Sequence, residues 1–142
     1  MKRENIEQKA LDTYLKGGFH CAEVISKTIV EVFGTGQTAD IPKVASGFGG
    51  GIGLTKQDTC GTLIGGIISL GCLYGRNTAG MDIQKIAGLT KEFRERFIEK
   101  NESTRCPEIL QRFGEQENMM KCKQMTAEVT GMLAELILEM QG

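Results

Sequence analysis

Four of the five cysteines in this sequence stand where a helix is expected to begin. They are Cys21, Cys60, Cys106 and Cys122, and they are called the helix-start cysteines below. Asp58 and Thr59, just before Cys60, are good N-cap residues. Pro107, just after Cys106, is tolerated in the first turn of a helix. Free backbone N–H groups and the helix dipole favour a thiolate there, so this placement predicts metal-binding or redox chemistry.

Each helix-start cysteine also begins an apolar stripe. Cys21, for example, is followed at helical spacing by Ile25 and Ile29. We therefore expect all four side chains to point inward at one end of their helices. If those ends meet in the fold, the four sulfurs form one group. A single buried cysteine is also a common core residue, so it is the shared placement that favours a functional site.

The fifth cysteine, Cys72, is expected to play a different part. It follows Cys60 within the same expected helix, about 18 Å further along the axis at about 1.5 Å per residue. A disulfide needs Cα atoms within about 7 Å of each other, and two ligands of one cluster must also lie close together. We therefore expect Cys72 to lie in the core, outside the site.

Three chemistries remain open for the helix-start cysteines. All four could ligate an iron–sulfur cluster that passes one electron at a time. Without a metal, they would be catalytic redox-active thiols in pairs such as Cys21–Cys60 or Cys106–Cys122. Four thiolates would also suffice for a structural zinc site.

Several common site motifs are absent from the sequence. No C-x-x-C occurs, which argues against a zinc ribbon, a thioredoxin-type motif and covalent haem attachment. The glycine loop, residues 47–53, fits neither G-x-x-x-x-G-K-[ST] nor G-x-G-x-x-G. The single histidine, His20, cannot build a multi-histidine metal site. We expect it at a solvated helix start, with support of a site at Cys21 as the alternative.

Glycines four residues apart mark the expected helix 58–75. Gly61 and Gly65 form one such pair, and this spacing lets another helix approach closely. Gly61 and the glycine loop could also leave room for a cofactor next to Cys60. Gly61 and Gly65 are therefore candidate cofactor-binding residues.

The elements that must position these residues are helices. No alternating strand pattern of useful length appears, so we expect an all-α fold, a single-domain bundle over residues 1–142 with six or seven unequal helices and the glycine-rich loop. The expected helices span residues 3–16, 20–33, 41–46, 58–75, 82–100, 105–113 and 119–140, with a further loop at 34–40.

Composition limits the partners and the location. Charged residues make up 25% and the net charge is −1, which argues against nucleic acid or an acidic membrane surface as a partner. The uncharged run 59–75 is shorter than the roughly 20 residues of a membrane span. The polar N-terminal segment lacks the apolar core of a secretory signal. We therefore expect a cytoplasmic protein, in which thiols stay reduced.

The chain resembles the C-GCAxxG-C-C family of redox-active proteins over residues 10–138. The segment Cys60-Gly61-Thr62-Leu63-Ile64-Gly65 is similar to the CGAxxG motif, with Thr62 in place of alanine. The glycine run ASGFGGGIG, the segment ISLGCLYGR and the remaining helix-start cysteines are similar as well. The resemblance implies redox activity through the four cysteines, without a defined substrate. From the cysteines themselves we expect electron transfer and a redox partner protein. The resemblance leaves open whether the chain is an oxidoreductase or an electron carrier, and whether it forms a homo-oligomer.

Overall fold

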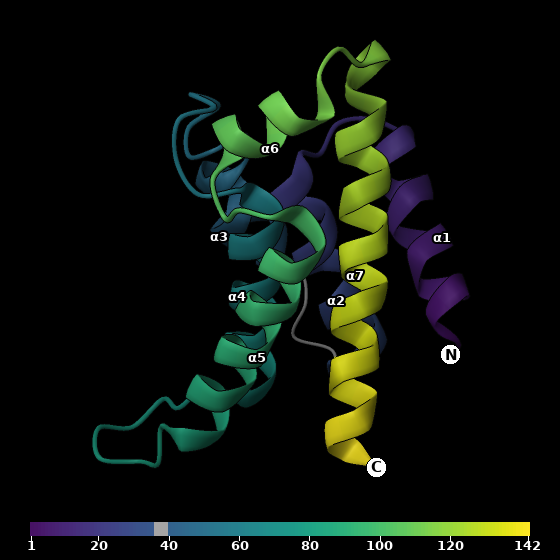
Figure 1. Cartoon of the computed structure of the whole chain (residues 1–142). Coiled ribbons are helices and arrows are strands. Elements are labelled where there is room, and N and C mark those ends of the chain that lie inside the picture. The colour runs from purple at the N-terminus through teal and green to yellow at the C-terminus, as the bar shows by residue number, and fades with distance from the viewer. Residues whose placement is uncertain (36–39) are drawn as a thin grey trace.

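The computed structural model describes residues 1–35 and 40–142, and the regular elements in these residues are helices. The α-helices are α1 (Arg3–Leu15), α2 (Cys21–Phe33), α3 (Ile41–Ala45), α4 (Gly61–Tyr74), α5 (Gln84–Asn101), α6 (Cys106–Phe113) and α7 (Met120–Gln141) (Figure 1). Two 3-10 turns, Ser46–Phe48 and Glu117–Met119, complete them. The predicted all-α fold is confirmed. Part of the loop expected at 34–40 lies outside the described residues.

The longest helix, α7, organises the bundle. It runs alongside α1, and α2 packs closely on α4 (Figure 1). The core between them is filled by aromatic and aliphatic side chains, among which Phe93, Phe97 and Leu133 are fully buried. Each such side chain contributes roughly 1.5–3 kcal/mol when it leaves water, so these contacts hold the helices in place.

Two glycines of α4 let neighbouring elements approach closely. A Cβ atom on Gly65 would lie 2.4 Å from the carbonyl oxygen of Ala22 in α2. A Cβ atom on Gly66 would lie 2.4 Å from Cε2 of Phe93 in α5. The predicted close approach at the glycine pairs is therefore found at Gly65, where it brings the start of α2 next to the start of α4.

Helix α4 begins at Gly61, three residues later than the expected start at residue 58. Thr59, just before this start, pairs with Arg105 in an isolated antiparallel bridge. The capping residues expected to open the helix thus bind another segment. This bridge ties the start of α4 to the start of α6.

The expected place of Cys72 in the core is wrong, because its side chain is exposed. The buried face of α4 carries Ser69 and Leu70 in this part of the helix. Cys72 lies two residues beyond Leu70, which rotates it by about 200° to the opposite side. Cys72 was also expected to lie outside the site of the other four cysteines, and this agrees with its exposed position on the opposite side of α4.

Among the described residues, the structure contains no helix that is long and apolar enough to cross a membrane.

Candidate functional site

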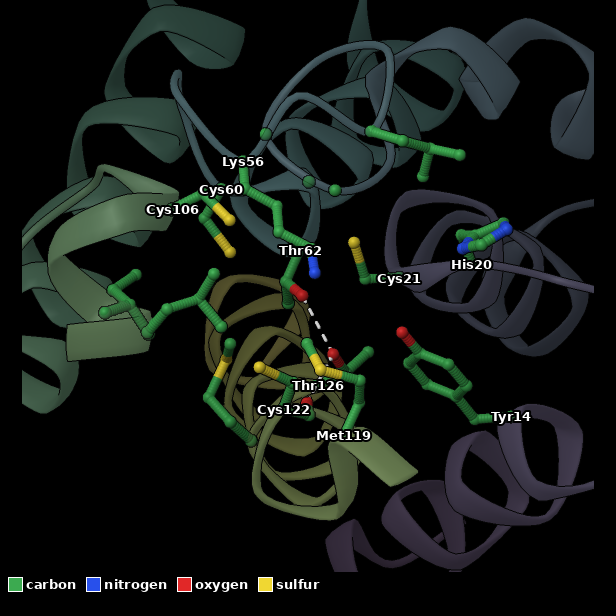
Figure 2. Close-up of a pocket in the computed structure, with 17 residues that line it drawn as sticks. Tyr14, His20, Cys21, Lys56, Cys60, Thr62, Cys106, Met119, Cys122 and Thr126 are labelled. Carbon is green, nitrogen blue, oxygen red and sulfur yellow. Dashed lines mark hydrogen bonds between the residues drawn. The ribbon is translucent and has the colours of Figure 1, made fainter. Parts of the chain in front are cut away.

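The helix-start cysteines stand at the N-terminal ends of four different helices. Cys21 opens α2, Cys60 directly precedes α4, Cys106 opens α6, and Cys122 lies in the first turn of α7. All four line one cavity of about 420 Å³ (Figure 2). Residues that are up to 101 positions apart in sequence, Cys21 and Cys122, therefore share one site. All five cysteines of the described chain are free thiols.

The remaining walls of the cavity are mostly apolar. α6 and α7 contribute Ile109, Leu110 and Met125, which keep water from the sulfurs on that side. The polar lining consists of side chains from several segments, which are Tyr14, His20, Lys56, Thr62 and Thr126. No aspartate or glutamate occurs among the described residues of the lining. The site is thus rich in sulfur donors and poor in oxygen anions.

Cys60 and Cys106 are held in register by two backbone hydrogen bonds. The N–H of Cys60 donates to the carbonyl oxygen of Thr104 at 2.8 Å, and the N–H of Cys106 donates to that of Asp58 at 2.8 Å. These bonds flank the isolated bridge, so both cysteines lie on the same face as diagonal neighbours. Diagonal neighbours in such a pair stand about 7–8 Å apart, beyond the usual Cα range of a disulfide. This arrangement suits two ligands of one larger group better than a direct disulfide between them.

Cys21 reaches the site because position 61 has no side chain. A Cβ atom on Gly61 would lie 2.5 Å from Cys21 Sγ and 2.8 Å from the carbonyl oxygen of Phe48. Gly61 also lines the cavity, as a candidate cofactor-binding residue should. Gly65 faces Ala22 at the helix crossing and is not among the described lining residues. A cofactor contact of either glycine stays a prediction.

The glycine loop covers the other side of the cavity. Gly51 has a φ of +71°, and a Cβ atom there would lie 2.8 Å from Cys106 Cβ. The chain then returns, and the N–H of Lys56 donates to the carbonyl oxygen of Gly50 at 2.8 Å. Figure 2 shows the Lys56 side chain extending into the cavity among the sulfurs. Sequence reasoning missed Lys56, because nothing in its local pattern distinguishes it from a solvated loop lysine.

Buried hydroxyl groups form the floor of the cavity. The side-chain oxygens of Thr62 and Thr126 lie 2.9 Å apart, and both residues are fully buried (Figure 2). The hydroxyl of Thr126 donates to the carbonyl oxygen of Cys122 at 2.9 Å. The Thr126 hydroxyl has one proton, and this bond uses it. In the bond between the two threonines, the Thr62 hydroxyl is therefore the donor and the Thr126 oxygen the acceptor.

Gln116 holds Cys122 from outside the helix. Its Oε1 atom accepts the backbone N–H of Cys122 at 3.0 Å, and its Nε2 atom donates to Cys122 Sγ at 3.3 Å. One amide side chain therefore satisfies a free N–H group of the first turn of α7 and orients the sulfur. Sequence reasoning missed this residue because the contact spans an irregular segment.

His20 and Tyr14 complete the rim. His20 is exposed and precedes α2, where its backbone N–H donates to Glu23 Oε1 at 2.9 Å. The predicted solvated helix start is therefore found. His20 also lines the cavity, and its support of a site at Cys21 stays a prediction. Tyr14 comes from α1 and is half-buried in the lining. Burial, and then the neighbouring cysteines, raise the pKa of its phenol, so it stays a neutral hydrogen-bonding group.

The protonation state of the helix-start cysteines differs from the expected one, because the sequence predicted thiolates. Burial raises the pKa of all four helix-start cysteines. Burial and then the charge of Cys21 raise the pKa of Cys60 to about 12. Cys122 is the next cause after burial for the raised pKa of Cys106, while Lys56 lowers the pKa of Cys106 and of Cys122. Desolvation outweighs the helix termini, so the free thiols are protonated at neutral pH.

The four helix-start cysteines line the same cavity. Among the described residues, no group of three or more His, Cys, Asp or Glu side chains is arranged to hold a single metal ion.

These features define an all-α protein whose four cysteines, from four helix starts, enclose one cavity. The chain belongs to the family described as "Putative redox-active protein (C_GCAxxG_C_C)", which matches residues 19–136. The matched range holds all four helix-start cysteines and excludes α1, so Tyr14 of the lining lies outside it. The search of curated proteins and the search of solved structures returned no match.

Proposed function

We propose that this redox-family protein is an electron-transfer protein whose helix-start cysteines ligate an iron–sulfur cluster. The observation that carries the proposal is the cavity of about 420 Å³ that all four free thiols line. Thiolates are the soft ligands that iron–sulfur clusters use, and the described lining offers no carboxylate to compete with them. When bound, such a cluster accepts and releases one electron at a time.

The arrangement of the sulfurs favours a cluster over a single ion. A zinc ion needs four ligands close around one point, and the described side chains form no such group. In an iron–sulfur cluster the four cysteines are divided among two or four iron atoms, so they stand further apart than the four ligands of one ion. The diagonal placement of Cys60 and Cys106 suits this requirement. Zinc remains the alternative to be tested.

The residues of the chain have distinct parts in this proposal. Cys21, Cys60, Cys106 and Cys122 would each lose a proton and bind iron. Because burial raises the pKa of these thiols, uptake of the cluster releases protons and is favoured by higher pH. Gln116 would donate a hydrogen bond to the Cys122 sulfur, which stabilises its negative charge. The apolar wall formed by α6 and α7 would limit the access of water.

A second candidate is metal-free thiol–disulfide chemistry. In it, two thiols lose two electrons and two protons to an oxidised partner and join as a disulfide. The charge interactions favour the pairs Cys21–Cys60 and Cys106–Cys122. After burial, the strongest influence that raises the pKa of Cys60 is the charge of Cys21, and for Cys106 it is the charge of Cys122. The same raised pKa values slow attack at neutral pH, since the thiolate is the nucleophile. The cluster is therefore the leading proposal.

Both candidates suit a reducing compartment such as the cytoplasm and require a redox partner protein. The deciding experiment is anaerobic purification followed by reconstitution with iron and sulfide. We expect iron and acid-labile sulfide in the desalted protein and visible absorption that bleaches with dithionite. A colourless protein without iron would contradict the cluster. If its free thiol count then falls by two or four on mild oxidation, the second candidate is supported.

A further inference from the structure

Lys56 supplies the only lysine or arginine side chain among the described residues that line the cavity. It forms no salt bridge with any described residue, although nine other ion pairs occur in this part of the chain. Figure 2 shows its nitrogen directed toward the space between the sulfurs. The ammonium group is therefore free to serve a ligand of the cavity.

The loop that carries Lys56 is held in an unfavourable backbone conformation. Ile52, Leu54 and Lys56 have φ angles of +68°, +61° and +61°, in the left-handed region that side chains with a Cβ avoid. Such strain persists where the surrounding structure enforces it, and it gathers at functional sites. Here the backbone bond from Lys56 to Gly50 and the packing of Gly51 on Cys106 enforce it. The loop is thus fixed to the cysteine site, which limits where Lys56 can reach.

Charge balance gives this lysine a role. Iron bound by four thiolates and sulfide carries a net negative charge, and burying that charge is costly unless an opposite charge accompanies it. The described lining supplies one such cation, on the side of Cys106 and Cys122. One-electron reduction adds a further negative charge to the same space, so the cation favours the reduced form.

We propose that Lys56 is the fixed counter-charge of the four-cysteine site and raises the reduction potential of the cluster bound there. This inference rests on the proposed function, in which the cluster takes its electron from a one-electron donor protein. Lys56 would bind no iron itself. It would act on the cluster through its charge, over the short distance that the glycine loop sets.

The test compares midpoint potentials of the reconstituted full-length protein. Wild type, Lys56→Met, Lys56→Arg and Lys43→Met are titrated anaerobically with dithionite at one pH and followed by visible absorption. Lys43 is an exposed lysine of α3, outside the cavity, and serves as the matched control. We expect Lys56→Met to have a more negative potential than wild type, Lys56→Arg to stay close to wild type, and Lys43→Met to be unchanged. The difference between Lys56→Met and wild type should shrink at high salt, because the lysine is exposed enough to be screened.

Several outcomes separate this inference from the proposed function. If wild type takes up no cluster, the proposed function falls and the inference falls with it. If wild type and Lys56→Met both hold a cluster at the same potential, only the role of Lys56 is overturned. If Lys56→Met alone fails to take up a cluster while Lys56→Arg succeeds, a positive charge is required for binding, which supports the counter-charge. If neither Lys56→Met nor Lys56→Arg takes up a cluster, the site requires the shape of the lysine side chain. The proposed role of Lys56 as a counter-charge is then overturned.

Discussion

The hydroxyl groups of Thr62 and Thr126 share a hydrogen bond of 2.9 Å beneath the cavity, and this bond joins α4 to α7 (Figure 2). Thr62 stands where the CGAxxG motif has alanine, so the bond is a feature that this chain adds to the motif. The side chain of Thr62 also lies next to Cys21 and Cys60 in the lining of the cavity. One added hydroxyl therefore links two helices next to two of the sulfurs.

Replacing Thr62 with valine should lower the stability by about 1 kcal/mol, the net worth of a typical buried hydrogen bond. Valine keeps the shape of threonine, so the loss reports on the bond. The free energy of unfolding in urea, measured on the metal-free reduced protein, checks this. Thr28→Val is the matched control, because the Thr28 hydroxyl is buried without a hydrogen-bond partner among the described residues. We expect no loss for the control, and equal losses in both variants would contradict the role of the bond.

Replacing Gly61 with alanine should disturb the site itself. The added Cβ would lie 2.5 Å from Cys21 Sγ and 2.8 Å from the carbonyl oxygen of Phe48, which forces one of them to move. We expect a loss of stability of about 1–3 kcal/mol, as for other overpacked positions, and a lower iron content after reconstitution. Urea unfolding and an iron assay measure the two effects.

Gly71→Ala is the control for this change. Gly71 also lies in α4, and a Cβ there would meet nothing within 4 Å. The substitution should stabilise the helix by roughly 0.5–1 kcal/mol, because alanine loses less backbone entropy than glycine. Unchanged iron binding in Gly61→Ala would show that Cys21 does not need its present position.

Serine in place of any one helix-start cysteine should remove most of the bound iron, because a neutral hydroxyl is a poor replacement for a thiolate ligand. The measurement is iron and sulfide per chain after anaerobic reconstitution, with circular dichroism to check that each variant is helical. Cys72→Ser is the control, since Cys72 is exposed and lies outside the cavity. Full iron binding in a folded Cys106→Ser or Cys122→Ser variant would remove that residue from the ligand set.

The helices and the cysteine placement could be predicted because both depend on local signals. Apolar residues at helical spacing located α2 and α7 to within one residue at each end. Cys106 next to Pro107 marked the start of α6, since proline fits only a first turn. The shared position of the four cysteines at the head of inward-facing stripes predicted that they point inward. That the four helix starts meet was only a condition of the predicted site, and the common cavity meets it.

What could not be predicted depends on contacts between distant segments. The sequence gives no signal that Gln116 folds back on Cys122, or that residues 58–60 pair with 104–106. Burial was misjudged at Cys72, because a uniformly apolar helix does not reveal which side faces solvent. The thiolate expected at each helix start was also misjudged, because the sequence does not state how deeply the sulfur is buried. The single-domain organisation and the cytoplasmic location stay predictions.

The raised pKa of Cys60 makes the stability of the metal-free protein depend on alkaline pH. Its folded pKa of about 12 lies above the unfolded value near 9.0, so the folded state keeps a proton that the unfolded state loses. The stability that the buried neutral thiol contributes is therefore complete below about pH 9. It declines between the two values, by at most about 1.4 kcal/mol per pH unit.

Urea unfolding under reductant at pH 8, 9 and 10 should show this decline in wild type. Tyrosines and lysines also titrate in alkali, so the informative quantity is the difference between wild type and Cys60→Ala, which lacks only the Cys60 titration. We expect the variant to lose less stability than wild type over this range. Partial burial raises the pKa of the Cys72 thiol as well, but this thiol is exposed, so Cys72→Ala should stay closer to wild type than Cys60→Ala does. Parallel curves for wild type and Cys60→Ala would mean that the Cys60 thiol titrates at its ordinary value. Cys60 would then face water in the metal-free protein, and the cavity would have to close around its sulfur only when a ligand binds.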